Sequence, residues 1–119
     1  MRGLLFSVSL KNNYEFRRLY NKGQSAALPT LVVYARKNKR PQNRVGYTVS
    51  VKLGHAVVRN RVRRRLREIY RLHEGELKPG YDIVVVARSR AVEASYRQLE
   101  KDFLHCLRRL ELIRTEGQA

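Results

Sequence analysis

The chain has 119 residues, of which 26 are Lys or Arg and 10 are Asp or Glu, so its formal net charge is +16. This length suits one domain with one hydrophobic core. The single cysteine, Cys106, excludes an intrachain disulfide and a zinc site built on several cysteines. A lone cysteine also favours a reducing compartment, and we expect a cytoplasmic protein with one domain over residues 1–119.

The positive charge is confined to one half of the chain. Residues 1–67 contain 17 basic residues and one acid, Glu15, whereas residues 68–119 have no net charge. A segregated positive surface is typical of proteins that bind nucleic acid or anionic membranes. The N-terminal sequence MRGLLFSVSL has a short apolar run after Arg2, but the run is too short for a secretory signal and no cleavage site follows it. We expect residues 1–9 and 114–119 to be flexible ends.

The N-terminal half of the sequence predicts one short helix followed by three strands. The helix is bounded by Asn12 and Glu15, which have capping-box spacing, and by Gly23 at its C-terminal end. We expect a brief strand at Gln24–Leu28 before Pro29, and β-branched and aromatic residues indicate strands at Thr30–Arg36 and Val45–Val51. The last two strands flank a cationic loop, so we expect them to pair as a hairpin with a charged tip.

The stretch Arg59–Arg71 contains seven arginines and one acid, Glu68. Apolar residues recur at helical spacing through it, at Val58, Val62, Leu66, Ile69 and Leu72. We therefore predict a helix that ends near Leu72 or His73, with one packed face and one positive face. Like charges three and four residues apart repel one another, and a bound polyanion would relieve that repulsion. The alternative is a merely solvated charged face, which a single acid among seven arginines does not favour.

Two further elements complete the predicted fold. Tyr81–Ala87 is almost continuously apolar, as in a central strand that is covered on both faces. Ser95 and Gln98 have capping-box spacing, and the apolar residues after them recur at helical intervals as far as Leu110. The resulting order, α-β-β-β-α-β-α, predicts an α+β fold in which helices pack against a mixed sheet.

The residues needed for catalysis by a protein are not clustered in the sequence. His55, His73 and His105 lack the spacing of metal ligands, and Cys106 lies on the apolar face of the last predicted helix. Neither a phosphate-binding glycine loop nor a nucleophile elbow is present. The polypeptide alone is therefore predicted to bind a partner and not to act as a catalyst.

Three aromatic residues, Phe16, Tyr20 and Tyr34, would lie near one another if the first helix packs on the sheet. Beside a positive surface they could stack on unpaired bases. Thr48 and Ser50 belong to a small polar strand face that can admit a ligand. The alternative is that the three aromatics are ordinary core residues, the commoner role of aromatics at helical spacing. Periodicity leaves both interpretations open.

The sequence KLGHAVVRNRVRRRLRE, which runs from Lys52 to Glu68, closely resembles the signature of the protein subunit of bacterial ribonuclease P. The hallmark of that family is an Arg-Asn-Arg triplet that opens a basic helix, and here the triplet is Arg59-Asn60-Arg61. The resemblance extends to EFRRLYNKG, RVG and YDIVVVAR, and it covers about residues 10–110.

The resemblance implies an α+β two-layer sandwich with a left-handed βαβ crossover, similar to the second domain of a small-subunit ribosomal protein. It also implies that a separate RNA subunit with bound Mg²⁺ removes the 5′ leader of precursor tRNA, with one protein per ribonuclease P RNA and no membrane partner. The positions that match RNA-contacting residues are Lys52, Arg59, Asn60, Arg61, Arg63, Arg64, Arg67 and Arg71. Those that match the cleft for the single-stranded leader are Phe16, Tyr20, Tyr34, Thr48 and Ser50.

Two departures from the family pattern each remove one positive charge. Val51 stands where the family commonly has a lysine, and Ser9 stands where it often has an arginine. The arginines at positions 63–65 are expected to compensate for these losses.

Two other functions are compatible with a basic helix. A ribosomal or RNA-chaperone protein would bind structured RNA without a processing role, and a peripheral membrane protein would use a cationic amphipathic helix. The apolar stripe of the arginine helix argues against the membrane role, because Val58, Val62 and Leu66 are needed to cover the central strand.

Overall fold

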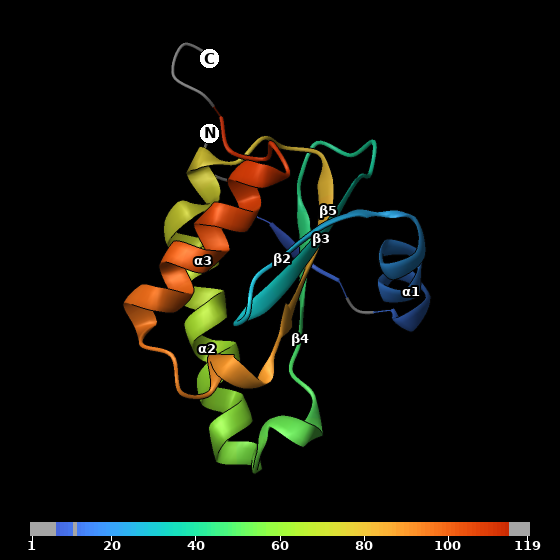
Figure 1. Cartoon of the computed structure of the whole chain (residues 1–119). Helices are drawn as coiled ribbons and strands as arrows, with labels where there is room; N and C mark the ends of the chain where they lie inside the picture. Colours follow the sequence, from blue (N-terminus) through green and yellow to red (C-terminus); the bar gives the residue numbers. More distant parts are fainter. Residues whose placement is uncertain (1–6, 11, 115–119) are drawn as a thin grey trace.

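The computed structural model describes residues 7–10 and 12–114. A five-stranded sheet lies between α1 on one face and α2 with α3 on the other (Figure 1). The elements are β1 (Val8–Ser9), α1 (Asn13–Lys22), β2 (Gln24–Ala27), β3 (Leu31–Lys37), β4 (Arg44–Thr48), α2 (Ala56–His73), β5 (Tyr81–Ala87) and α3 (Tyr96–Arg109). Short 3₁₀ turns lie at Val51–Leu53, Glu74–Glu76 and Ser89–Ala91. Of the ends that were expected to be flexible, residues 1–6 and 115–119 lie outside the described residues.

The strand order is β1-β4-β5-β3-β2, which places β5 at the centre of the sheet. β5 pairs antiparallel with β3 and parallel with β4, so the sheet is mixed, as predicted. α2 forms the crossover between β4 and β5, and this crossover turns in the left-handed sense (Figure 1). The predicted hairpin of β3 and β4 is wrong, because β5 lies between them. The continuous apolar sequence of β5 suits the centre of the sheet, where α2 and α3 cover Ile83 and Val85 on one face and α1 covers Val84 on the other.

The main hydrophobic core fills the space between the sheet and the layer formed by α2 and α3. Val33, Ile83 and Val85 of the sheet have no exposed surface and face this layer. Leu66 of α2 and Phe103 of α3 are equally buried against them. The sheet and these two helices form the sandwich that the resemblance implied, and α1 adds cover on the opposite face.

A second, smaller cluster lies beneath α1. Leu10, Leu19 and Val84 are buried in it. Gly46 of β4 allows α1 to approach the sheet closely, since a Cβ atom at that position would lie 2.5 Å from Cζ of Phe16. The absent side chain of Gly46 therefore fixes how deeply α1 sits on β4.

The apolar stripe of α2 differs from the prediction at its C-terminal end. Val62, Leu66 and Ile69 are buried as expected, but Leu72 is 54% exposed and Tyr70 is buried in its place. Successive residues of a helix are rotated by about 100° around its axis. Tyr70 therefore lies about 40° from Leu66, whereas Leu72 lies about 120° from Leu66. The stripe therefore passes through Tyr70 and leaves Leu72 at the surface.

His73 connects the last turn of α2 to α3. Its Nδ1 atom is 2.7 Å from Oε2 of Glu76, and its Nε2 atom is 2.7 Å from Oε2 of Glu100. Burial lowers the pKa of His73, but the hydrogen bonds to Glu100 and Glu76 outweigh this effect and raise the pKa above its ordinary value.

We expect the stabilising contribution of His73 to depend on pH. Because folding raises its pKa, the contribution is fully present below about pH 6.5, the ordinary value for histidine, and is lost as the pH rises through the higher folded pKa. Urea unfolding should show that His73→Gln loses more stability at about pH 6 than at about pH 9. An equal loss at both values would show that protonation of this imidazole does not stabilise the fold.

Candidate nucleic-acid interface

The face of α2 that points away from the sheet carries most of the predicted RNA-binding residues. Asn60, Arg61, Arg64, Arg67 and Arg71 are exposed on it, and Arg59 and Arg63 are half-buried. Of the seven arginines in α2, only Arg71 forms an ion pair with a described residue, at 3.8 Å from Glu68. The charge of this face is therefore almost uncompensated, an arrangement that attracts a polyanion.

Two arginines of α2 are held by backbone carbonyl groups. Nε of Arg59 donates a hydrogen bond to the carbonyl oxygen of Gly54 at 3.1 Å, which fixes its guanidinium beside the start of the helix. Arg65 donates to the carbonyl oxygen of Ala94 at 3.3 Å, so its guanidinium points toward the segment before α3. Of the three arginines expected to compensate for the missing cations, Arg65 is therefore directed toward the protein itself.

The chain between β4 and α2 places Lys52 next to the basic helix. β4 ends at Thr48, earlier than predicted, and Val51 starts a 3₁₀ turn with 72% of its surface exposed. Oγ of Ser50 accepts a hydrogen bond from the backbone N–H of Lys52 at 3.2 Å and so caps this turn. Gly54 follows with φ of 144°, a conformation that residues with side chains rarely adopt. The turn therefore leads directly from the polar end of β4 to α2.

The predicted aromatic residues come together where α1 packs on the sheet. The rings of Tyr20 and Tyr34 meet edge to face with their centroids 5.0 Å apart. The hydroxyl of Tyr20 is 2.8 Å from Oγ1 of Thr48, and Phe16 packs over Gly46. Phe16 and Tyr34 are partly buried against the small core, whereas Tyr20 is 37% exposed. The group thus packs α1 on the sheet and leaves part of the Tyr20 ring exposed, and its stacking on bases stays a prediction.

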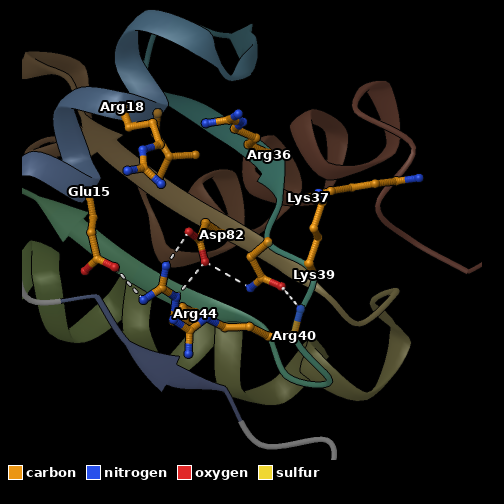
Figure 2. A pocket seen from close by; sticks show the side chains of 10 residues that line it. Glu15, Arg18, Arg36, Lys37, Lys39, Arg40, Arg44 and Asp82 are labelled. Carbon is orange, nitrogen blue, oxygen red and sulfur yellow. Dashed lines mark hydrogen bonds and ion pairs between the residues drawn. The ribbon is translucent and has the colours of Figure 1, made fainter.

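An ion network that the sequence did not reveal fixes α1 to the sheet (Figure 2). Arg44 of β4 donates hydrogen bonds to Oδ1 and Oδ2 of Asp82 at 2.8 and 2.7 Å, and a third to Glu15 of α1. The hydrogen bonds to Asp82 raise the pKa of Arg44 above its ordinary value, against the lowering effect of burial. The predicted capping box is wrong, since Asn12 makes no side-chain cap and the carboxylate of Glu15 binds Arg44 instead.

Cys106 has no exposed surface, and burial raises the pKa of its thiol to about 11, which keeps the thiol protonated and unreactive. Among residues 7–10 and 12–114, no group of three or more His, Cys, Asp or Glu side chains could hold a metal ion. Within the same residues, no helix is both long and apolar enough to cross a membrane.

Comparison with known proteins gives the family. A family model described as Ribonuclease P matches residues 6–111. The chain belongs to this family. It is 45% identical over 104 residues to the ribonuclease P protein component of Alkaliphilus metalliredigens, a match that covers 87% of this chain and 94% of that protein. It is 46% identical over 104 residues to the ribonuclease P protein component of Alkaliphilus oremlandii, with 87% and 91% covered.

Solved structures of ribonuclease P proteins share the fold. The structure from Staphylococcus aureus superimposes with a TM-score of 0.84 at 34% identity and covers 92% of this chain and 100% of that chain. The structure from Thermotoga maritima gives a TM-score of 0.76 at 31% identity, with 92% and 98% covered. These matches confirm the predicted family and fold, and they do not favour the ribosomal or RNA-chaperone alternative.

Proposed function

We propose that this chain is the protein subunit of a cytoplasmic ribonuclease P and takes part in 5′ maturation of tRNA. The observation that carries the proposal is the exposed basic face of α2, since only one of the seven arginines in this helix, Arg71, has an ion-pair partner among the described residues. Guanidinium groups bind phosphate oxygens through paired hydrogen bonds. With Lys52 and Asn60, this face is the proposed contact for the RNA subunit.

The group formed by Phe16, Tyr20, Tyr34 and Thr48 is the proposed contact for the single-stranded leader, with Ser50 just beyond the end of β4. Its support is the open ring surface of Tyr20 beside a hydroxyl group, a combination that can stack on a base and bind its edge. The group lies on the face of the sheet opposite α2 (Figure 1). One protein could therefore touch both the RNA subunit and the leader.

Cleavage of the phosphodiester bond is assigned to the RNA subunit, with Mg²⁺ bound through that RNA. Phosphate oxygens of RNA are the hard ligands that Mg²⁺ prefers. The part assigned to this chain is to neutralise phosphates, which raises the affinity for precursor tRNA and supports the folded RNA when Mg²⁺ is scarce. We propose one protein per RNA, because α2 offers one continuous basic face.

The test is cleavage of a precursor tRNA by a bacterial ribonuclease P RNA at low Mg²⁺, with and without this protein. We expect strong stimulation by the protein and no cleavage by the protein alone. Absence of stimulation, despite tight and salt-sensitive binding to the RNA, would reject the processing role and leave a binding role only.

Replacement of Tyr34 by alanine is expected to weaken binding of precursor tRNA by about 1–3 kcal/mol, the usual contribution of one stacked base. Binding of mature tRNA, which lacks the leader, should not change. Affinities of the assembled ribonucleoprotein for both RNAs would be compared, with Tyr34→Phe as the matched control because it keeps the ring. Equal losses for both RNAs in Tyr34→Ala would assign Tyr34 to the fold alone.

A further inference from the structure

A second basic site lies between α1 and the end of β3, on the face of the sheet opposite α2. It is a pocket of about 280 Å³. Its basic lining residues are Arg18, Arg36, Lys37, Lys39, Arg40 and Arg44, and its acidic ones are Glu15 and Asp82. In Figure 2, Arg18 and Arg36 extend from α1 and β3 on the same side of the pair formed by Arg44 and Asp82.

The two acidic residues do not neutralise the pocket as a whole. Glu15 and Asp82 both bind Arg44, and their side chains are only 10% and 16% exposed. None of the other five basic side chains forms an ion pair with a described residue. The lining therefore carries a net charge of +4, from six cations and two carboxylates. Such a concave positive site favours an anion.

The loop that forms one wall of the pocket is held in place by Asn38. The backbone N–H of Asn38 donates to the carbonyl oxygen of Gly80 at 2.9 Å, and its Oδ1 accepts from the N–H of Arg40 at 2.8 Å. Its Nδ2 donates to Oδ1 of Asp82 at 3.0 Å and to the carbonyl oxygen of Gln42 at 3.1 Å. The loop that carries Arg40 is thus fixed before any ligand arrives, which lowers the entropy lost on binding.

The position of the pocket limits which segment of RNA can bind in it. Arg36 follows Tyr34 by two residues on the same face of β3, so the two side chains are about 7 Å apart along the strand. This is the face covered by α1, whereas the basic residues of α2 lie beyond the opposite face. An RNA segment bound along α2 would therefore not fill this pocket, and a different segment would have to do so.

We propose that this pocket binds a phosphate group of an RNA backbone, with the guanidinium groups of Arg18 and Arg36 as the main contacts. The paired N–H groups of arginine match phosphate oxygens. The proposal goes beyond the function proposed above, because it adds a second phosphate contact on the face of the sheet that α1 covers. The phosphate can come from the upstream part of the leader or from the RNA subunit.

The test compares R18Q/R36Q with R97Q/K101Q, a matched control that removes two exposed cations from α3. Fluorescence anisotropy would measure binding of three RNAs: ribonuclease P RNA alone, and, in the assembled ribonucleoprotein, precursor tRNA with a long leader and with a trimmed leader. Loss of one phosphate contact should weaken binding roughly fivefold to tenfold at ~0.1 M salt and lower the slope of log affinity against log salt by about 1.

A loss in R18Q/R36Q for the long leader only would support the proposal with the leader as the source. Weaker binding of R18Q/R36Q to the isolated ribonuclease P RNA would support the proposal with the RNA subunit as the source of the phosphate. Values equal to those of R97Q/K101Q for all three RNAs would overturn the proposal. If R18Q/R36Q unfolds at a lower temperature than the unmodified protein, K39Q/R40Q is measured in its place and the same outcomes apply. The cleavage test of the proposed function uses the unmodified protein, so failure of one inference is distinguishable from failure of the other.

Discussion

Replacement of Arg61, Arg64 and Arg67 by glutamine is expected to weaken binding of ribonuclease P RNA by roughly 10²-fold to 10³-fold at ~0.1 M salt. The three side chains are exposed on α2 and have no ion-pair partner among the described residues, so each is free to bind phosphate. Each lost contact leaves one phosphate un-neutralised, so fewer counterions are released on binding. The slope of log affinity against log salt should therefore fall by about 0.7–0.9 per contact. Binding titrations across a range of salt concentrations measure both quantities.

The matched control replaces three basic residues of α3 by glutamine. These residues are also exposed: Arg97, Lys101 and Arg108. Both variants lose three positive charges, so a general effect of net charge would weaken them equally. We expect the α3 variant to stay within a few-fold of the unmodified protein. If the two variants bind alike, α2 is not the specific RNA contact.

Replacement of Arg44 by alanine is expected to destabilise the fold by about 3 kcal/mol or more, because it leaves two carboxylates without their cation. The side chains of Arg44, Glu15 and Asp82 are 17%, 10% and 16% exposed, so water can replace the lost guanidinium only in part. Urea unfolding of the free protein at neutral pH measures the change in the free energy of unfolding. A loss below about 1 kcal/mol would show that water solvates the network well enough to make it equivalent to a surface ion pair.

The exposed pair of Arg71 and Glu68 supplies the control for Arg44. Its side chains are 66% and 51% exposed and lie 3.8 Å apart, so Arg71→Ala should cost less than about 1 kcal/mol. A penalty in Arg44→Ala no larger than that in Arg71→Ala would show that burial of the network adds nothing to its contribution.

The two capping boxes show where local sequence is sufficient and where it is not. Ser95 caps α3 as predicted, since its Oγ accepts a hydrogen bond from the N–H of Gln98 at 3.1 Å. The same spacing at Asn12 and Glu15 gives no side-chain cap, and the Glu15 carboxylate binds Arg44 instead. A cation from a strand 29 residues away thus outcompetes a local partner. Charge-assisted hydrogen bonds are about twice as strong as neutral ones.

The candidate sites divide in the same way. The basic face of α2 follows from periodicity within one helix, so the sequence alone identifies its arginines. Tyr20 contacts Tyr34 and Thr48 because α1 packs across β3 and β4. The sequence predicts that the aromatic residues lie together only if this packing is assumed. The pocket beside Arg36 combines residues of α1, of the strands β3, β4 and β5, and of the loop after β3, and no spacing in the sequence indicates it. The RNA-contact roles of these residues stay predictions.

By itself the sequence determined the helices and longer strands, the basic face of α2 and the family, because these depend on residues close together in the chain. Only the tertiary structure decided that β5 separates β3 from β4, that Arg44 binds two carboxylates, and that α1 completes a positive pocket. Strand order depends on which apolar strand needs cover on both faces, and ion networks depend on which side chains the finished sheet brings together. Both are properties of the whole packed chain.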